Sequence, residues 1–280
     1  MNEYAVIDIG SNTVRYMGAD GNKRLVTTRL AQGLTQSGVL GEEAMRRSVE
    51  AVCAFVALSR EEGLTPRAYA TSAVRDAKNA HVFLDMLKSA CSLAVDVLSG
   101  EREARYALLG AGDACGALVD IGGGSSQVIA GDFQASFPMG CVRAKEICAD
   151  ADTLDEMKRR LYERCEGIYR FPRLSVLNWT GVGGTITTLA ALSLGLTQYD
   201  KQAVSSCTLT IDGAEELTRA LHSMGEARKE HPLLAERHDV IVPGALILLY
   251  IMRGRGITKL HVSDADGMEG YLTYLRSLYC

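Results

Sequence analysis

A short motif, in which an apolar run contains an aspartate and ends at a glycine, occurs twice in this sequence. The first copy is Ile7-Asp8-Ile9-Gly10 and the second is Val119-Asp120-Ile121-Gly122, an offset of 112 residues (120 minus 8). Asp20 and Asp132 keep the same offset. Each copy predicts a buried strand, a tight turn and a returning strand. The repeat therefore indicates two domains built on one plan.

The second copy, within residues 118–132, contains residue types that suit phosphate binding. Its three consecutive glycines let backbone N–H groups approach an anion closely, and two serines follow as further donors. The Asp120 carboxylate is placed where a phosphate-bound magnesium ion could be held. The alternative is an ordinary glycine-containing hairpin whose aspartate bonds only to nearby backbone N–H groups. The repeat favours the phosphate interpretation.

The length and composition fit this organisation. A chain of 280 residues exceeds the usual size of one hydrophobic core, and we expect domains at residues 1–116 and 117–280. Hydrophobic residues make up 47% and charged residues 23%, which is typical of a globular α/β protein. The net charge of −4 argues against general nucleic-acid binding, which needs a basic surface.

Neither a membrane segment nor a disulfide framework is expected. The longest apolar run, residues 240–252, contains Pro243 and Gly244 and is shorter than the roughly 20 residues of a bilayer span, so it predicts a buried helix. The first residues lack the basic region of a signal peptide. The eight cysteines form no C-x-x-C pair, which favours reduced thiols in a cytoplasm.

Hydrophobic periodicity predicts alternating strands and helices, as in open sheets covered by helices. In the first half we expect strands at 4–9, 14–19, 24–29, 67–70 (with 71–75 leaving its end) and 93–98, and helices at 42–62, 80–90 and from 99 to about 110. In the second half we expect a hairpin through residue 132, strands at 134–138, 175–180 and 259–262, and helices at 141–149, 153–169, 186–194, 213–223, 243–252 and after 266.

Several stretches carry more specific signatures: VIDIGSNTVR (6–15), ATSAVRDAKN (70–79), LSGEREAR (98–105), LVDIGGGSS (118–126), PMGCVRAKE (138–146), GVGGTITTLAAL (181–192), DVIVPGALIL (239–248) and VSD (262–264). In this order along the whole chain, they closely resemble the exopolyphosphatase and guanosine pentaphosphate phosphohydrolase (Ppx/GppA) family. That family belongs to the actin, Hsp70 and sugar kinase superfamily. The resemblance, to the short two-domain form, implies two duplicated ribonuclease H-like (actin-like ATPase) α/β domains facing a central cleft.

The resemblance also implies residues for the metal and the phosphate. Mg²⁺ would be associated with the carboxylates of Asp8 and Asp120. The two glycine turns and a third turn at the start of a helix would grip phosphate, through Ser11, Asn12, Thr13, Gly123, Gly124, Ser125, Gly183, Gly184 and Thr185. A helix N-terminus attracts anions through its free N–H groups and dipole. The alternative for Gly183 and Gly184 is close packing of helix on strand.

The catalytic carboxylate implied by the resemblance is Glu103, directly before Ala-Arg in the SG-x-x-EAR motif. Its implied role is general base, orienting and deprotonating a water that attacks the terminal phosphorus. On the sequence alone, a glutamate in a helix's first turn is explained by the helix dipole. Glu101 is the weaker candidate. Arg75 would clamp phosphate, with a surface ion pair to Asp76 as the alternative.

Two positions depart from the family's pattern. Gln127 stands where a glutamate is usual after the DIGGGS motif, and a neutral amide is neither an acid, a base nor a strong Mg²⁺ ligand. Met268 stands where the family often has arginine before Glu-Gly. Both departures are expected to weaken metal binding and catalysis.

We therefore predict a cytoplasmic, Mg²⁺-assisted hydrolase that removes the terminal phosphate of polyphosphate or guanosine pentaphosphate. One alternative is a weakly active or non-catalytic sensor that binds polyphosphate or guanosine tetra- or pentaphosphate. Another is an ATP-dependent kinase of the same superfamily, which the Ser99–Arg105 motif disfavours. The sequence does not distinguish polyphosphate from the nucleotide as the substrate. Lys23, Arg24 and Arg29 fit either a basic surface that binds a long polyphosphate or ordinary solvated positions of an edge strand. The resemblance implies a homodimer.

Overall fold

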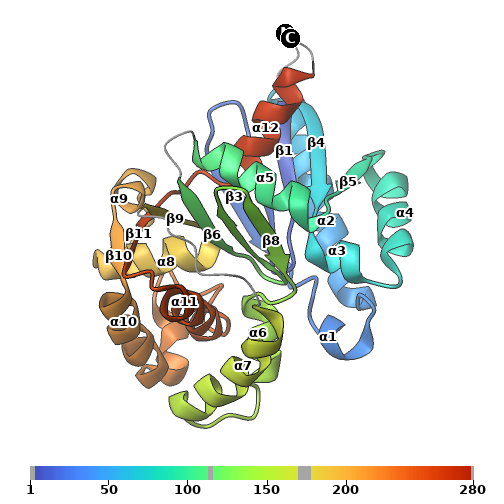
Figure 1. Ribbon diagram of the computed structural model, residues 1–280. Helices are drawn as coiled ribbons and strands as arrows, with labels where there is room; N and C mark the ends of the chain where they lie inside the picture. The colour runs from blue at the N-terminus through green and yellow to red at the C-terminus, as the bar shows by residue number, and fades with distance from the viewer. Residues whose placement is uncertain (1–3, 113–115, 170–177, 279–280) are drawn as a thin grey trace.

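The computed structural model describes residues 4–112, 116–169 and 178–278, and its first half is built around a five-stranded sheet (Figure 1). The strand order is β3-β2-β1-β4-β5. The strands are β1 (Tyr4–Ile9), β2 (Thr13–Met17), β3 (Lys23–Thr27), β4 (Thr65–Ala70) and β5 (Val95–Val97). The helices of this half are α1 (Leu34–Ser37), α2 (Glu42–Glu61), α3 (Ser72–Asp76), α4 (Ala80–Cys91) and α5 (Gly100–Ala111).

The second half is built around a six-stranded sheet of order β10-β11-β9-β6-β7-β8. Its strands are β6 (Ala117–Ile121), β7 (Ser126–Ala130), β8 (Phe133–Phe137), β9 (Trp179–Val182), β10 (Thr208–Thr210) and β11 (Lys259–Val262). Its helices are α6 (Cys141–Ile147), α7 (Leu154–Ile168), α8 (Gly184–Ser193), α9 (Lys201–Ser205), α10 (Ile211–Ser223), the 3₁₀ helix η1 (Gly225–Glu230), α11 (Ile241–Arg255) and α12 (Gly267–Ser277).

The two sheets repeat one topology, which confirms the duplication expected from the sequence. β1 pairs antiparallel with β2 and parallel with β4, while β6 pairs antiparallel with β7 and parallel with β9. The register also repeats, because Asp8 lies opposite Arg15 and Asp120 lies opposite Gln127. The predicted fold class, two actin-like α/β domains, is therefore confirmed.

Helices α5 and α12 lie side by side and each packs on the sheet of the other half (Figure 1). α5 buries Ala104 and Ala107 against Leu118 and Ile129 of the second sheet. Helix α12 joins the apolar cluster on the first sheet, which contains Tyr4, Val6, Met17, Tyr69, Leu98, Tyr106, Met268, Tyr271 and Leu275. Because each helix packs on the sheet of the other half, the N-terminal ends of both helices lie at the space between the sheets.

The contact between α5 and α12 depends on two glycines. A β-carbon at Gly110 would lie 1.8 Å from the carbonyl oxygen of Asp266, and one at Gly270 would lie 1.9 Å from that of Tyr106. Real β-carbons do not approach backbone this closely, so any side chain at either position would push the helices apart. Asp266, at the N-terminal end of α12, is held in place by this contact.

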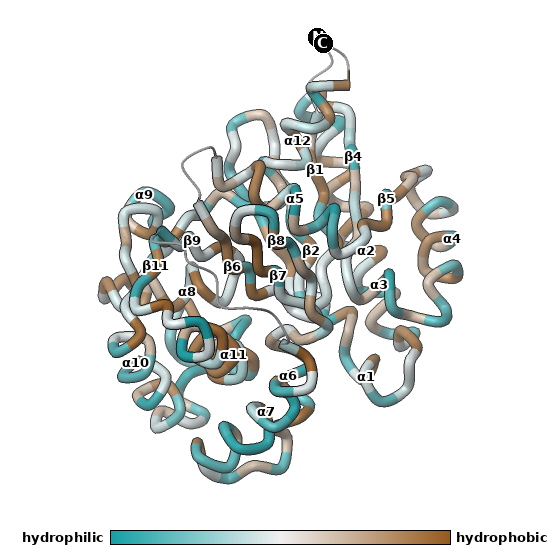
Figure 2. The backbone as a smooth tube through the Cα atoms, viewed as in Figure 1, coloured by the Kyte–Doolittle hydropathy of each residue, from teal (hydrophilic) through white to brown (hydrophobic). Residues whose placement is uncertain are grey.

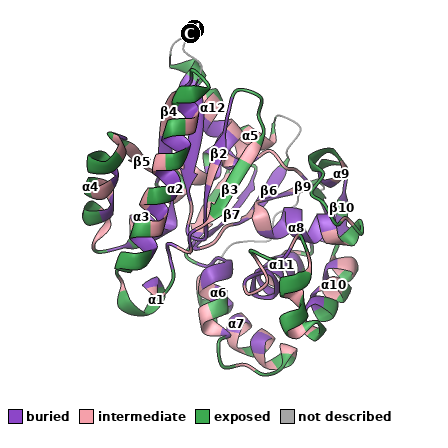
Figure 3. Cartoon of the chain, turned by 180° about the vertical axis from the view of Figure 1, so that it is seen from behind, coloured by how far each residue is buried: buried purple, intermediate pink, exposed green. Residues whose placement is uncertain are grey.

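The main core lies in the second half, where α11 is buried along nearly its whole length (Figures 2 and 3). The predicted buried helix at 243–252 is thus confirmed, with Pro243 in its first turn, where a missing N–H costs nothing. The edge strand β3 is the opposite case, with Leu25 and Val26 exposed. No described helix has both the length and the apolar character needed to cross a bilayer.

The sequence prediction differs from the structure in a few elements. Residues 72–76, expected to leave the strand, form the one-turn helix α3, because Arg75 N–H reaches back to the Thr71 carbonyl at 3.0 Å. The short elements α1, α9 and β10 were not predicted, since they are too short to show periodicity. The strand predicted at 175–180 lies largely outside the described residues, and β9 begins at Trp179.

Candidate active site

The two glycine turns have the same backbone structure. Gly10 N–H donates to the carbonyl of Thr13 at 3.0 Å, and Gly122 N–H donates to the carbonyl of Ser125, also at 3.0 Å. The turns face each other closely, since a β-carbon at Gly123 would lie 2.8 Å from the Ser11 β-carbon. Glycine is therefore required where the two halves of the chain meet.

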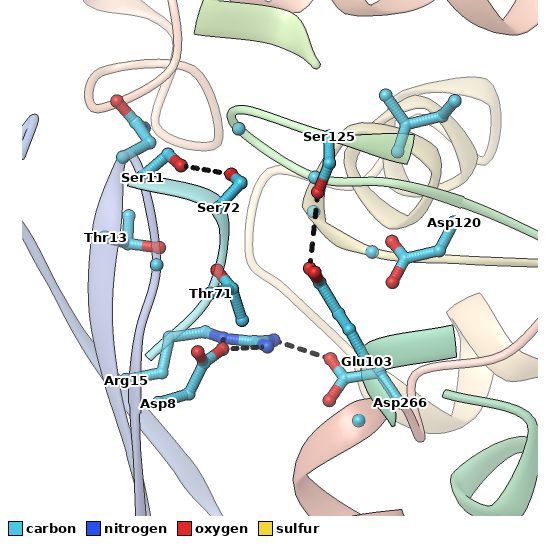
Figure 4. Close-up of a pocket in the computed structure, with 18 of the residues that line it drawn as sticks. Asp8, Ser11, Thr13, Arg15, Thr71, Ser72, Glu103, Asp120, Ser125 and Asp266 are labelled. Atoms are coloured by element: carbon cyan, nitrogen blue, oxygen red, sulfur yellow. Dashed lines mark hydrogen bonds and ion pairs between the residues drawn. The ribbon is translucent and has the colours of Figure 1, made fainter. Parts of the chain in front are cut away.

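Hydroxyl groups from three elements surround the space beside these turns (Figure 4). Ser11 Oγ and Ser72 Oγ share a hydrogen bond of 2.9 Å, and Ser125 Oγ donates to Glu103 Oε1 at 3.4 Å. Asn12 is also buried here, and its Nδ2 atom has no hydrogen-bond partner. Such donors suit the oxygens of a phosphate, and Asn12 has an N–H available for one.

Glu103 is presented to this space by the first turn of α5. The Ser99 hydroxyl caps that helix by accepting from Arg102 N–H. Arg75 Nη1 donates to Glu103 Oε2 at 3.0 Å and to the Leu98 carbonyl at 2.9 Å. Burial raises the pKa of Glu103 to about 7 against the opposing effect of Arg75. A carboxylate with this pKa can accept a proton at neutral pH.

On the first hairpin, Arg15 links two buried carboxylates (Figure 4). Its guanidinium donates to Asp8 Oδ2 through Nε at 2.8 Å and to Asp266 Oδ2 through Nη1 at 2.5 Å. Burial would raise the pKa of Asp266, but Arg15 and Lys23 hold it well below its usual range. Burial raises the pKa of Asp8 in spite of Arg15. The three side chains form a fixed charged cluster between the sheets.

On the second hairpin, the Asp120 carboxylate has no hydrogen bond or ion pair to any described residue. Burial raises its pKa to about 7, and the negative charges of Asp266 and Glu103 add to this effect. Its Oδ1 atom lies against Gly183, where a β-carbon would come within 2.2 Å. Asp120 is thus a partly buried acid with no ion pair of its own among the described residues.

The oxygens available at Asp8 and Asp120 fit a magnesium ion held jointly with substrate. Asp8 Oδ1 is buried and has no hydrogen-bond partner, and Asp120 is unpaired. Across the described ranges, no group of three or more His, Cys, Asp or Glu side chains is arranged to hold a metal by itself. Mg²⁺ commonly takes one or two carboxylates and completes its shell with water and phosphate oxygens.

The third predicted phosphate element, the N-terminus of α8, opens into the same pocket. Gly183 and Gly184 line it, and Gly183 has φ 86°, a conformation that favours glycine. The guanidinium of Arg237 lies directly against Gly184. Free N–H groups at the start of a helix and a nearby guanidinium both favour an anion.

The structure brings most of the predicted site residues together. The pocket is lined by Asp8, Ser11, Asn12, Thr13, Glu103, Asp120, Gly123, Ser125, Gly183 and Gly184. It is not lined by Gly124, Thr185 or Arg75. Gly124 packs against Ser72 and Ser11, whose Oγ atoms would lie 2.3 and 2.7 Å from a β-carbon there. Arg75 lies behind Glu103 and is 3.5 Å from Asp76 Oδ1.

Several lining residues were not among the site residues predicted from the sequence, including Arg15, Ser72, Arg237 and Asp266. Arg15 and Ser72 lie inside quoted motifs, and the hairpin register opposite Asp8 could have identified Arg15. Asp266 is the N-cap of α12 and forms a capping box with Glu269. Nothing in the local sequence around Arg237 indicates its position.

The two residues that depart from the family pattern differ in their surroundings. Gln127 is fully buried, and its Nε2 donates to Ser125 Oγ at 3.0 Å and to Ser136 Oγ at 3.1 Å. It therefore contacts the serine that contacts Glu103. Met268 packs in the apolar cluster between α12 and the first sheet. A substitution at Met268 would act mainly on packing, and one at Gln127 on the site.

Duplicated sheets of this topology, with a polar pocket between their glycine turns, define the class of two-domain actin-like proteins. Within that class the chain belongs to the Ppx/GppA phosphatase family, whose model matches residues 21–276. It is 31% identical to Exopolyphosphatase 2 of Mycobacterium tuberculosis, over 96% of this chain and 97% of that protein.

Two further comparisons agree. The chain is 37% identical to guanosine-5'-triphosphate,3'-diphosphate pyrophosphatase of Photobacterium profundum, over 50% of this chain and 32% of that protein. Its structure resembles that of the Aquifex aeolicus PPX-GPPA enzyme with a TM-score of 0.76 and 31% identity, covering 98% of this chain and 99% of the other. The family assignment therefore holds for sequence and fold alike.

Proposed function

We propose that this protein hydrolyses the terminal phosphoanhydride bond of inorganic polyphosphate or guanosine pentaphosphate. The observation that carries the proposal is the placement of Glu103, whose carboxylate enters the pocket beside both glycine turns and has a pKa of about 7. Similar proteins are named exopolyphosphatase and guanosine-5'-triphosphate,3'-diphosphate pyrophosphatase. Both names denote cleavage of phosphoanhydrides.

In the proposed reaction the terminal phosphoryl group lies between the two turns. Its oxygens accept hydrogen bonds from backbone N–H groups and from hydroxyls such as those of Ser11 and Ser125. The ionised Glu103 accepts a proton from a water molecule as the water oxygen bonds to the terminal phosphorus. The anhydride P–O bond breaks, and the shortened chain leaves with the bonding electron pair. Arg75 and Ser125 fix the direction of the Glu103 carboxylate.

A magnesium ion would be held by Asp8 and Asp120 together with phosphate oxygens. When bound, Mg²⁺ supplies positive charge that stabilises the charge developing on phosphoryl oxygens. The protein's own part is to keep the unpaired oxygens of these two carboxylates directed into the pocket.

The direct test measures phosphate release from long polyphosphate and from guanosine pentaphosphate, each with and without Mg²⁺. We expect release from at least one substrate, dependent on the metal, and near-complete loss in Glu103→Ala. Unchanged release by the purified Glu103→Ala protein would refute the assignment. The ratio of the two rates would identify the preferred substrate.

A second candidate function, a sensor that binds the same phosphates without turnover, is favoured by Gln127. This neutral side chain contacts Ser125 where the family usually places an acid. A sensor would show calorimetric binding with no phosphate release, and Gln127→Glu would then create activity or strengthen metal binding. Brisk turnover by the wild-type protein would exclude it.

A further inference from the structure

Lys23, at the start of the edge strand β3, is directed into the protein. Its side chain is 16% exposed, whereas that of the next residue, Arg24, is 59% exposed. Lys23 Nζ donates to the Asp264 carbonyl at 2.6 Å. It also lies 3.0 Å from Glu269 Oε1 and 3.4 Å from Asp266 Oδ2. Lys23 is therefore neither a solvated residue of an edge strand nor part of a basic surface, but an internal cation that joins the first sheet to the segment entering α12.

The Asp266 carboxylate is held at both of its oxygen atoms. Asp266 Oδ2 accepts from Arg15 Nη1 at 2.5 Å and faces the Lys23 ammonium. Asp266 Oδ1 accepts from the Met268 N–H at 3.0 Å, as the cap of α12. The Asp266 N–H in turn donates to Glu269 Oε2 at 2.9 Å. Both carboxylate oxygens are thereby engaged, which fixes the side chain in one orientation.

Arg15 connects this carboxylate to Asp8 in the pocket (Figure 4). Its guanidinium is a planar fork with donors in fixed directions. While Nη1 donates to Asp266, Nε and Nη2 both donate to Asp8 Oδ2, with Nε at 2.8 Å. Asp8 Oδ1 is left buried and without a hydrogen-bond partner among the described residues. The orientation of the guanidinium therefore decides which Asp8 oxygen stays available to a cation.

Lys23 supplies one of the two positive charges within this cluster, and Arg15 supplies the other. Together they face three carboxylates, those of Asp8, Asp266 and Glu269. Two buried carboxylates that compete for a single guanidinium are each left with too little positive charge. Without Lys23, Asp266 would depend on Arg15 alone among these cations. The hold of Arg15 on Asp8 would then weaken or shift.

We propose that Lys23 is a positioning residue for the divalent cation of the site. By holding Asp266 it fixes Arg15, and Arg15 in turn keeps Asp8 Oδ1 free in the pocket. The inference rests on the proposed function, which assigns the metal to Asp8 and Asp120. Lys23 is not among the described residues that line the pocket, so it acts on a metal ligand rather than on the substrate. Outer-shell groups of this kind orient the residues that bind a metal.

Metal binding to the inactive protein tests the inference without requiring turnover. The affinity for Mn²⁺, a paramagnetic substitute for Mg²⁺, would be measured by electron paramagnetic resonance in the presence of imidodiphosphate. The proteins compared are Glu103→Gln alone and the same variant combined with Lys23→Met. We expect Lys23→Met to weaken Mn²⁺ binding by about 10-fold, the lower end of the effect of losing an outer-shell partner. Calorimetry without metal should show imidodiphosphate binding within about threefold of the parent variant, because Lys23 does not contact the glycine turns.

A double-variant comparison separates this role from a general loss of stability. If Lys23 acts through Asp266, Lys23→Met should change the Mn²⁺ affinity by less than about twofold when Asp266→Asn is already present. An equal loss with and without Asp266→Asn would contradict the inference. If Lys23→Met does not fold, Lys23→Gln keeps a donor to the Asp264 carbonyl without the charge, and the same loss of Mn²⁺ affinity is expected.

The matched control is Arg24→Met, which removes the exposed cation of the next residue on β3 and its pair with Glu62. It should leave both affinities unchanged. Unchanged Mn²⁺ affinity in Lys23→Met, or no Mn²⁺ binding by the parent variant, would overturn the inference. Failure of the proposed function would be separate, since it would appear as no phosphate release by the wild type.

Discussion

The two hairpins at the centre of this molecule share a backbone and differ in charge. Each places an aspartate on its inner strand, Asp8 or Asp120, and each closes its turn with the same 3.0 Å hydrogen bond. The residue opposite the aspartate is Arg15 in one and Gln127 in the other. Asp8 is therefore ion-paired, whereas Asp120 has no ion pair to any described residue, and burial raises its pKa to about 7.

The two copies of the duplicated hairpin therefore have different roles in the site. The first hairpin holds a fixed charge cluster that also anchors α12 through Asp266. The second hairpin leaves its acid free and directs its neutral Gln127 towards Ser125, which contacts Glu103. The two carboxyl groups whose pKa burial raises to about 7, Asp120 and Glu103, both lie beside the second hairpin.

The largest effect on the free energy of unfolding is expected for Arg15→Gln. This substitution places opposite Asp8 the residue type that lies opposite Asp120 in the second hairpin. Asp8 would become an uncompensated buried charge, which typically costs about 3 to 5 kcal/mol. Urea denaturation at pH 7 would measure the loss. Arg24→Gln, on the neighbouring strand β3, breaks an exposed pair with Glu62 at the end of α2 and should cost less than about 1 kcal/mol. Similar losses for the two variants would contradict the role assigned to Arg15.

A smaller effect of opposite sign is expected for Asp120→Asn. Because the folded-state pKa is raised, ionising Asp120 removes stability as the pH rises from about 4 through 7. The asparagine of the variant cannot ionise. Without metal, the free energy of unfolding of the variant should therefore exceed that of the wild type by roughly 2 to 4 kcal/mol at pH 8 and equal it near pH 4. Thermal unfolding at both pH values would measure this. A variant less stable than the wild type at pH 8 would show that Asp120 has a partner.

The smallest effect is expected from Gln127→Glu, which makes the two hairpins differ further. A new carboxylate beside Ser125 should strengthen Mg²⁺ binding several-fold, on the order of one charge-assisted contact. Titrating the Mg²⁺ dependence of phosphate release would measure the change. Metal dependence identical to the wild type would show that residue 127 lies outside the reach of the metal.

The sequence predicted most of the fold because its signals were local or repeated. The duplicated motif identified both hairpins, hydrophobic periodicity located α2 and α7, and the long apolar run located α11. Elements such as α3 were missed because one turn of helix has no periodicity to detect. The packing of α12 on the first sheet was also missed, since it joins residues about 200 or more positions apart, such as Met268 and Tyr69.

The same reasoning applies to the site. Glycine turns and Glu103 are visible as motifs, whereas the partners of each charge are set by tertiary contacts. Arg75 illustrates this, because the sequence shows only a motif arginine next to Asp76 and the structure pairs it with Glu103 across 28 positions. Arg237 reaches the pocket through the fold of the second half and has no local sequence signature.

The most direct test of the account is the pH dependence of phosphate release by Glu103→Gln, with Glu101→Gln as control on the exposed side of the same helix turn. For the wild type, kcat/KM should rise with pH to a plateau with a midpoint near 7, as Glu103 ionises. Glu103→Gln should be about 10²- to 10⁴-fold slower and lack this rise, and Glu101→Gln should match the wild type. A Glu103→Gln protein with wild-type rate and pH profile would contradict the assignment of Glu103 as the general base.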